Sequence, residues 1–242
     1  MTRVGAALRA GVREYRRTPV LLALLVALPA YAIWVFAVVA PDTAAPLALD
    51  GGTVRVALGE ALPAFMTPMV AALVTGIAGL FVMQTAAETD ARLVVAGYRP
   101  VELVLARLGL LLGVSALATA VSVGVMLTAF DPKHLAWFAG ATALTALIYG
   151  MVGVLAGVAL DRLPGVYLIL FGALVDLFLF QNPLATDPPA LATYLPGHFP
   201  LQLATQAGFA ASVDFGSLPG ALVALVALTA LATVAFYRSM AV

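Results

Sequence analysis

The chain has 242 residues, of which 63% are hydrophobic and only 10% are charged, and its mean hydropathy is +1.08. This composition excludes a water-soluble domain and predicts an integral membrane protein. Twelve basic residues balance twelve acidic ones and do not cluster with aromatic residues, so no nucleic-acid partner is expected. The sequence contains no cysteine and only two histidines, which excludes disulfides and thiolate sites and argues against a metal site.

The N-terminal residues 3–17 are predicted to form a basic amphipathic helix on the inner membrane surface. Its apolar residues share one helical face, and Arg9, Arg13 and Arg16 share the adjacent one. The uncharged run 19–40 is long enough to cross about 30 Å of hydrocarbon and is the first predicted span. A cleaved secretory signal is the alternative, because arginines precede this run, but the run is longer than a usual signal core.

Five further spans are predicted from the remaining apolar runs. A polar outer loop, 41–62, precedes the second span and is expected to contain at most a short helix near its end. The third run is longer than a span requires, so its helix is expected to tilt or to project from the membrane. The predicted spans two to six are 63–86, 101–130, 135–160, 165–180 and 218–236.

The distribution of basic residues predicts the orientation. Ten of the twelve fall on one side of the six spans, and only Arg55 and Lys133 fall on the other. Because basic loops stay in the cytoplasm, we expect both termini there, in a multi-pass protein of the cell membrane. The predicted fold class is an all-α polytopic membrane protein that forms a single transmembrane domain over residues 1–242.

The outer segment 182–217, between predicted spans five and six, contains five prolines that break any long helix. It retains apolar stretches that suit short helices. Such a segment can dip into the membrane where protein or water covers its backbone, and an ordinary folded outer loop is an equal alternative. His198, within it, is expected to be a surface histidine.

The charged loop 87–100, between predicted spans two and three, is the leading candidate for a functional contact. Its acid at 88 precedes a base at 92 by four residues, which favours a short helix. Gly97 can end that helix, and Pro100 suits the first turn of the next one. We therefore expect a short cytoplasmic helix over 87–97 that contacts a soluble partner. The candidate contact residues are Glu88, Asp90, Arg92, Leu93, Val94 and Tyr98.

Asp176 is the second candidate, because an ionised carboxylate inside a span is costly unless it is paired or hydrated. It is predicted either to line a substrate pathway or to reach outward and hydrogen-bond the segment after Gln181. Gln84 and Tyr149 are its candidate partners and candidate pathway residues. For Gln84, a simple hydrogen bond between helices is the favoured alternative.

Nucleotide chemistry is not expected in this chain, since it has no GxxxxGK[ST] phosphate loop and no motif of a hydrolase or metalloprotease. We expect it to hold no cofactor and no metal and to have no catalytic residue. Glycines within the spans are expected to form close helix-packing surfaces. These are Gly76, Gly79, Gly150, Gly153 and Gly157.

In layout, the chain resembles the permease subunit of an ABC-2 type ABC transporter. The likeness rests on the basic amphipathic helix before span one, the charged loop, and the proline-rich outer segment. Within the loop, Glu88 and Asp90 match the acids of the family's E-x-E-x-G-T-L pattern, although the following Gly-Thr is missing. The resemblance to the family extends to Pro100, Glu102 and Arg107.

This resemblance implies a transmembrane subunit that pairs with a second copy or a paralogue in membrane lipid. Separate ABC ATPase subunits would bind ATP and magnesium and drive the transport of a hydrophobic or amphipathic substrate, and the resemblance favours export. A secondary transporter is one alternative, but it needs ion-coupling groups near the midplane, where only Asp176 stands out. A membrane scaffold or enzyme subunit is another, although no catalytic pair supports the enzyme.

Overall fold

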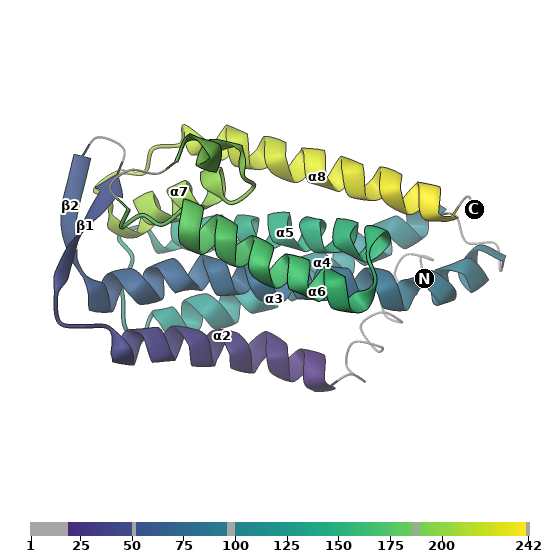
Figure 1. Ribbon diagram of the computed structural model, residues 1–242, viewed down its shortest axis with the longest axis horizontal. Helices are drawn as coiled ribbons and strands as arrows, with labels where there is room; N and C mark the ends of the chain where they lie inside the picture. The colour runs from purple at the N-terminus through teal and green to yellow at the C-terminus, as the bar shows by residue number, and fades with distance from the viewer. Residues whose placement is uncertain (1–18, 50–51, 96–99, 186–188, 241–242) are drawn as a thin grey trace.

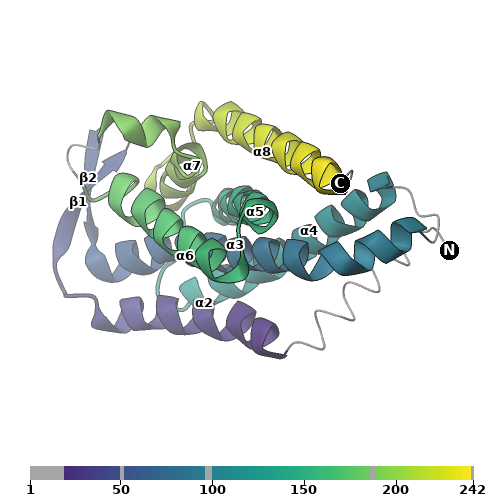
Figure 2. The ribbon, with the colours of Figure 1, turned by 45° about the vertical axis from the view of Figure 1, so that its right-hand side comes forward.

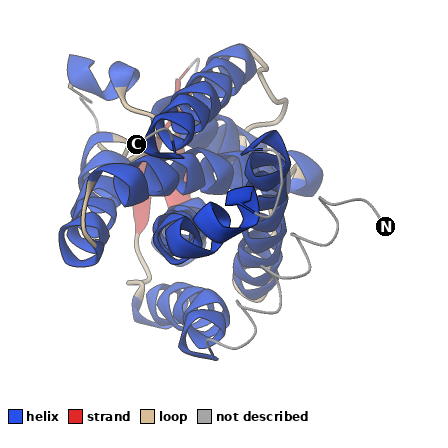
Figure 3. Cartoon of the chain, turned by 90° about the vertical axis from the view of Figure 1, so that its right-hand side faces the viewer, coloured by secondary structure: helices blue, strands red, loops and turns tan. Residues whose placement is uncertain are grey.

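The computed structural model describes residues 19–49, 52–95, 100–185 and 189–240 of the chain. The helices lie roughly along one long axis and form an elongated bundle, and a two-stranded hairpin lies across one end (Figures 1 and 3). We call this the hairpin end, and we call the opposite end, where the last helix finishes, the terminal end. The predicted amphipathic helix over 3–17 lies outside the described residues.

Helices account for most of the described chain. Five of them are long and apolar enough to cross a membrane, and a sixth contributes a shorter apolar stretch, Leu25–Val39. In chain order the elements are α2 (Pro19–Val39), β1 (Ala44–Leu49), β2 (Gly52–Ala57), α3 (Leu58–Val95), α4 (Pro100–Met126), α5 (Leu135–Ala159), α6 (Arg162–Ala173), the π-helical segment η1 (Leu174–Phe180), the 3-10 helix η2 (Ala190–Tyr194), α7 (His198–Phe209) and α8 (Ser217–Met240).

These helices confirm a mostly helical protein and are consistent with a helical polytopic membrane protein. The predicted spans 19–40 and 135–160 agree with α2 and α5 to within one residue at each end. The predicted span 101–130 is too long, since α4 ends at Met126 and a turn follows it. The fifth span is one continuous run of α6 and η1 that begins at Arg162.

The expectation of an all-α chain is wrong for the outer loop 41–62. This loop forms an antiparallel hairpin, in which Leu49 pairs with Gly52 and Ala44 pairs with Ala57. The hairpin has its own apolar anchor, because Leu47 and Val56 are buried in the main core cluster. Their burial supplies the tertiary support that an isolated two-stranded hairpin needs in water.

The predicted short helix over 87–97 also differs from the structure. Helix α3 runs without a break from Leu58 to Val95, so these residues extend the second span rather than forming a separate helix. The physical reason is that residues 80–96 contain neither glycine nor proline, and therefore nothing in the sequence interrupts the helix. The predicted break at residues 96–99 lies outside the described residues.

Helix α5 lies at the centre of the bundle and contacts α3, α4, α6, α7 and α8. Its closest approach is to α3 and uses glycines on both helices, as predicted. A Cβ added to Gly153 would overlap the carbonyl oxygen of Gly76, and one added to Gly79 would overlap that of Gly150. The two backbones are therefore in direct contact, an arrangement that only glycine permits.

Candidate functional site

The outer segment between α6 and α8 runs from the hairpin end into the bundle and back out. Its inner tip is Gly197, whose N–H donates to the carboxylate of Asp176 at 2.9 Å. From there α7 returns over 12 residues, or about 18 Å. Near its far end, the backbone N–H of Lys133 donates to the carbonyl of Gly208 at 3.1 Å.

Both ends of α7 are capped by charged side chains from other parts of the chain. The carboxylate of Asp176 lies at its N-terminus, where the helix dipole favours negative charge. The ammonium of Lys133 donates to the carbonyl of Phe209 at 2.7 Å, at the C-terminus, where positive charge is favoured. The segment is therefore held at a fixed depth by two electrostatically matched contacts.

Asp176 lies in η1 and is only 4% exposed. Its carboxylate accepts hydrogen bonds from the hydroxyl of Tyr149 on α5 and from the N–H of Gly197, and at 3.1 Å from Nε2 of Gln181. Three donors from three parts of the chain thus satisfy this buried carboxylate, as a buried charge requires. The π-helical geometry contributes, because the Gln181 N–H bonds back to the Asp176 carbonyl, five residues earlier.

The orientation of Gln181 follows from its partners. Its Nε2 lies 3.1 Å from Asp176 Oδ1 and 2.7 Å from the carbonyl of Ala192, and both of those groups can only accept. The other amide atom, Oε1, therefore faces His198 Nδ1 at 3.0 Å and accepts its hydrogen. The buried carboxylate thereby fixes both the amide of Gln181 and the ring of His198.

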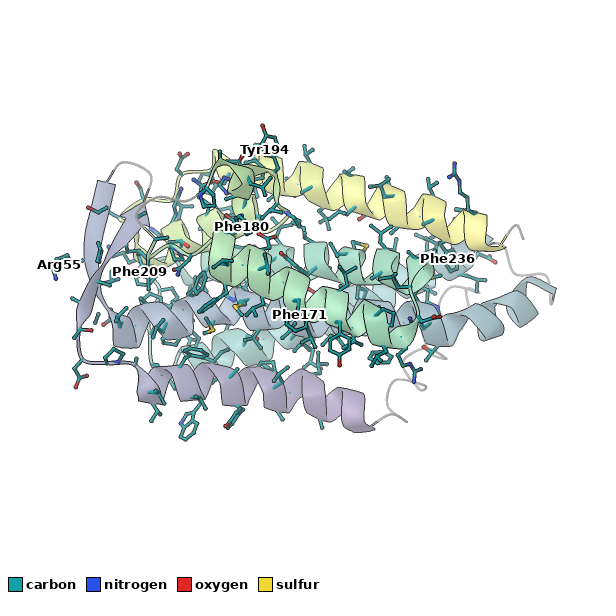
Figure 4. The ribbon with its side chains drawn as sticks, viewed as in Figure 1. Arg55, Phe171, Phe180, Tyr194, Phe209 and Phe236 are labelled. Atoms are coloured by element: carbon teal, nitrogen blue, oxygen red, sulfur yellow. The ribbon has the colours of Figure 1, made fainter. Side chains whose placement is uncertain are left out.

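An open cavity of about 260 Å³ lies beside this network at the hairpin end. Its walls are formed by strand β1, by the last residues of η1, by η2 and by α7. Phe180 is one of its lining residues and lies toward the hairpin end of the bundle (Figure 4). Gln181 and His198 also line it. Its floor is therefore built from side chains whose orientation the Asp176 network determines.

The structure brings together only some of the predicted pathway residues. Asp176 and Tyr149 are in direct contact, as expected for one of the two proposed partners. Gln84 is not part of the cluster, because it lies toward the terminal end and its Nε2 donates to the carbonyl of Leu160 at 3.1 Å. That bond joins α3 to the end of α5, which agrees with the alternative of a hydrogen bond between helices.

The predicted partner-contact residues occupy the last turns of α3 at the terminal end. The backbone of residues 88–94 is helical. Tyr98 lies outside the described residues, as do the side chains of Glu88, Asp90, Arg92, Leu93 and Val94. Their contact role remains a prediction.

The alternative that Asp176 hydrogen-bonds the segment after Gln181 agrees with its bond to the Gly197 N–H. Sequence reasoning did not identify Gly197 itself, and it missed the contributions of Gln181 and His198. His198, expected at the surface, is half-buried and bonded to Gln181. The available signal was weak: a polar residue directly after an apolar run, and a Pro-Gly pair at 196–197 followed by a histidine. Neither pattern specifies that the segment returns to the depth of Asp176.

No protein-family model matches this chain, and no curated protein matches it.

Proposed function

We propose that this chain is the permease subunit of an ATP-driven ABC transporter of the ABC-2 type. It spans the membrane six times, with α2 as the first span and both termini in the cytoplasm. It binds no nucleotide itself, pairs with a second permease chain, and moves an amphipathic or hydrophobic substrate when separate ATPase subunits hydrolyse ATP.

The observation that carries this proposal is the helical projection at the terminal end. The apolar part of α3 is Leu58–Thr85, and the helix continues for ten more residues, about 15 Å, to Val95. Together with the start of α4, this extension reaches beyond the ends of α6 and α8 (Figure 2). A projecting helix with charged residues is suited to contact a soluble subunit.

The rigidity of α3 supports a coupling role. Its projecting residues belong to the same helix as the glycines that pack against α5, so a displacement of residues 87–95 moves the glycine contact at the bundle centre as well. A partner can shift the conformation of the bundle only if it binds two conformations of the bundle with different affinity. Binding and hydrolysis of ATP by the partner would supply that difference.

Charge placement supports the orientation. Among the described basic residues, Arg107, Arg162 and Arg238 lie toward the terminal end, whereas Arg55 and Lys133 lie at the hairpin end. Arg55 points away from the bundle (Figure 4). Among these described residues, the basic side chains are more numerous at the terminal end, which is the cytoplasmic side in this proposal.

The test is purification of the tagged chain from its own membranes in a mild detergent. An ATPase that contains a GxxxxGK[ST] motif is expected to co-purify with it in stoichiometric amount. Replacing Leu93 and Val94 together by serine should weaken this retention, because burial of two such side chains contributes about 3 to 5 kcal/mol before association costs. The double variant should also lose substrate-stimulated ATP hydrolysis.

A matched control changes two apolar side chains at the other end. Val54 and Leu135 are 44% and 42% exposed, and replacing both by serine should leave the ATPase bound. Recovery of the chain with no such ATPase, or full retention by the Leu93→Ser/Val94→Ser variant, would overturn the proposal.

A further inference from the structure

Three buried hydroxyls inside the bundle have no hydrogen-bond partner among the described residues. They belong to Thr75 on α3 and to Thr119 and Ser122 on α4, whose side chains are 0%, 8% and 0% exposed. A buried polar group without a partner costs free energy, and nearly all such groups in folded proteins bond either protein or ordered water. These three hydroxyls therefore point to a ligand that can bond them.

The other buried threonines show how these helices satisfy a hydroxyl without a ligand. Thr67, Thr142 and Thr145 each donate to the carbonyl four residues earlier in their own helix, at 2.7 to 2.9 Å. The three unpaired hydroxyls make no bond of this kind. They are left to bond whatever lies between the helices.

The two unpaired hydroxyls of α4 lie on the face of that helix that meets α5. Ser115, Thr119 and Ser122 are spaced four and three residues apart and therefore share one face. The hydroxyl of Ser115 donates to the carbonyl of Ala143 on α5 at 3.4 Å, which is long for a bond between two oxygens. The one hydroxyl on this face that has a partner is thus only weakly bonded.

Thr75 lies at the inner end of the same junction. A Cβ added to Gly150 on α5 would lie 3.0 Å from Cγ2 of Thr75 and 3.1 Å from Cδ2 of Leu111, so α3 and α4 meet α5 at this point. Leu111 precedes Ser115 by one turn, and Ser122 lies 11 residues, or about 16 Å, beyond Leu111 toward the hairpin end. We call this line of hydroxyls, which begins at the α3–α5 glycine contact, the polar seam; it comprises Thr75, Ser115, Thr119 and Ser122.

The chemistry of the polar seam selects water rather than an ion. Hydroxyls donate and accept, as water does. A cation here would have no counter-charge, because Asp176 is the one buried acid among the described residues and already accepts three hydrogen bonds. An anion would have none either, since no Lys, Arg or His is buried in the part of the chain that the structure describes. A buried charge without a partner is costly, whereas buried water is a common component of folded proteins.

We propose that the polar seam binds internal water, which bonds the hydroxyls of Thr75, Thr119 and Ser122 and bridges α4 to α3 and α5. Helix α4 is then joined to the bundle centre through water, whereas α3 and α5 touch directly through their glycines. This inference does not rest on the function proposed above, because water binding requires neither ATP nor a partner.

The test is radiolytic labelling of the unaltered protein in lipid nanodiscs, since short X-ray pulses convert bound water into hydroxyl radicals that oxidise adjacent side chains. Met126 lies one turn beyond Ser122 on the same face of α4. Met66 is the matched control, because it lies nine residues before Thr75, on the opposite face of α3. The two methionines are 0% and 1% exposed and belong to one core cluster. Met126 should be oxidised at least about tenfold faster than Met66, and equal rates would overturn the proposal.

A variant locates the source of the radicals. Ser122→Ala removes the hydroxyl nearest to Met126 and should lower the oxidation rate of Met126 to that of Met66. Thr145→Val removes a buried hydroxyl that already bonds the carbonyl of Ala141, so it should leave the rate unchanged. Undiminished oxidation of Met126 in Ser122→Ala would mean that the radicals do not come from the polar seam, and would overturn the proposal.

The sign of a stability change tests the inner end. Thr75→Val keeps the side-chain shape but deprives bound water of a partner, so the midpoint of thermal unfolding should fall by about 2 to 4 °C. Thr67→Val is the matched control on the same helix, because its hydroxyl bonds only the carbonyl of Pro63, and its midpoint should change less. A rise in Thr75→Val, as expected for a dry unpaired hydroxyl, or equal changes in the two variants would contradict the proposal.

The labelling comparison uses the unaltered protein, so it remains decisive if a variant fails to fold. Since no ATPase takes part, its failure leaves the co-purification result standing. Loss of the ATPase partner would likewise leave a measured hydration site in place.

Discussion

The glycine contact between α3 and α5 makes a sharp prediction for Gly153→Ala. An added Cβ would overlap the Gly76 carbonyl oxygen and lie 2.8 Å from its carbonyl carbon. Ordinary contact begins at 3.4 Å, so the carbonyl carbon alone requires a separation of about 0.6 Å, and the oxygen, which is closer still, requires more. The clash is with backbone on both helices, and therefore no side-chain rotation relieves it.

The magnitude follows from two opposing effects. Overpacking a close helix contact costs up to about 3 kcal/mol, and alanine in place of glycine contributes about 1 kcal/mol of helix propensity. The net loss is about 2 kcal/mol, which for a chain of this size lowers the midpoint of thermal unfolding by about 4 to 8 °C. Far-ultraviolet circular dichroism of the purified protein in detergent would measure this shift.

Gly113→Ala on α4 is the matched control, because nothing lies within 4 Å of a Cβ added there. It should leave the midpoint unchanged or raise it by about 2 to 4 °C. If Gly153→Ala were as stable as Gly113→Ala, the two helices would not be in backbone contact, and α3 would not be coupled rigidly to α5.

The remaining predictions concern the buried carboxylate and the topology. Tyr149→Phe removes one of three donors to Asp176 and should cost about 1 kcal/mol. Asp176→Leu leaves the Tyr149 hydroxyl and the Gly197 N–H unpaired and removes one of the two bonds of the Gln181 amide, so it should cost about 3 to 5 kcal/mol in the same unfolding assay. Equal losses of unfolding free energy in the two variants would mean that the Asp176 carboxylate does not hold several donors at once. Single cysteines at Ala45 and Thr186 should react with an impermeant thiol reagent in intact cells, and one at Ala91 should not; labelling at Ala91 would overturn the orientation.

The spans were predictable because long apolar runs in a membrane protein have few alternatives to helix. Even so, the sequence did not predict where helix α3 ends. The charges of residues 87–97 differ from the apolar span and suggest a separate helix, but charge alone does not interrupt helical hydrogen bonds, and α3 continues to Val95. The hairpin carried a usable signal in its Asp-Gly pair at 50–51, followed by alternating valines at Val54 and Val56.

The polar site was only partly predictable. Asp176 stood out because a carboxylate in an apolar run requires a partner, and Tyr149 was one of two expected partners. Its bonds to Gly197 and, through Gln181, to His198 depend on a return of the chain that no local pattern encodes. Long-range contacts of this kind follow from the packing of α7 against α5 and α8.

The capped return of α7 has a consequence for the order of assembly in the membrane. A helix of 12 residues is too short to span the hydrocarbon by itself. In the orientation proposed above, we therefore expect it to pass to the outer side during synthesis and to dock into the bundle afterwards. The stretch 189–209 carries no Asp, Glu, Lys or Arg that would oppose this inward step. Its two docking points, Asp176 and Lys133, are both synthesised before it, so α7 docks onto helices that are already made.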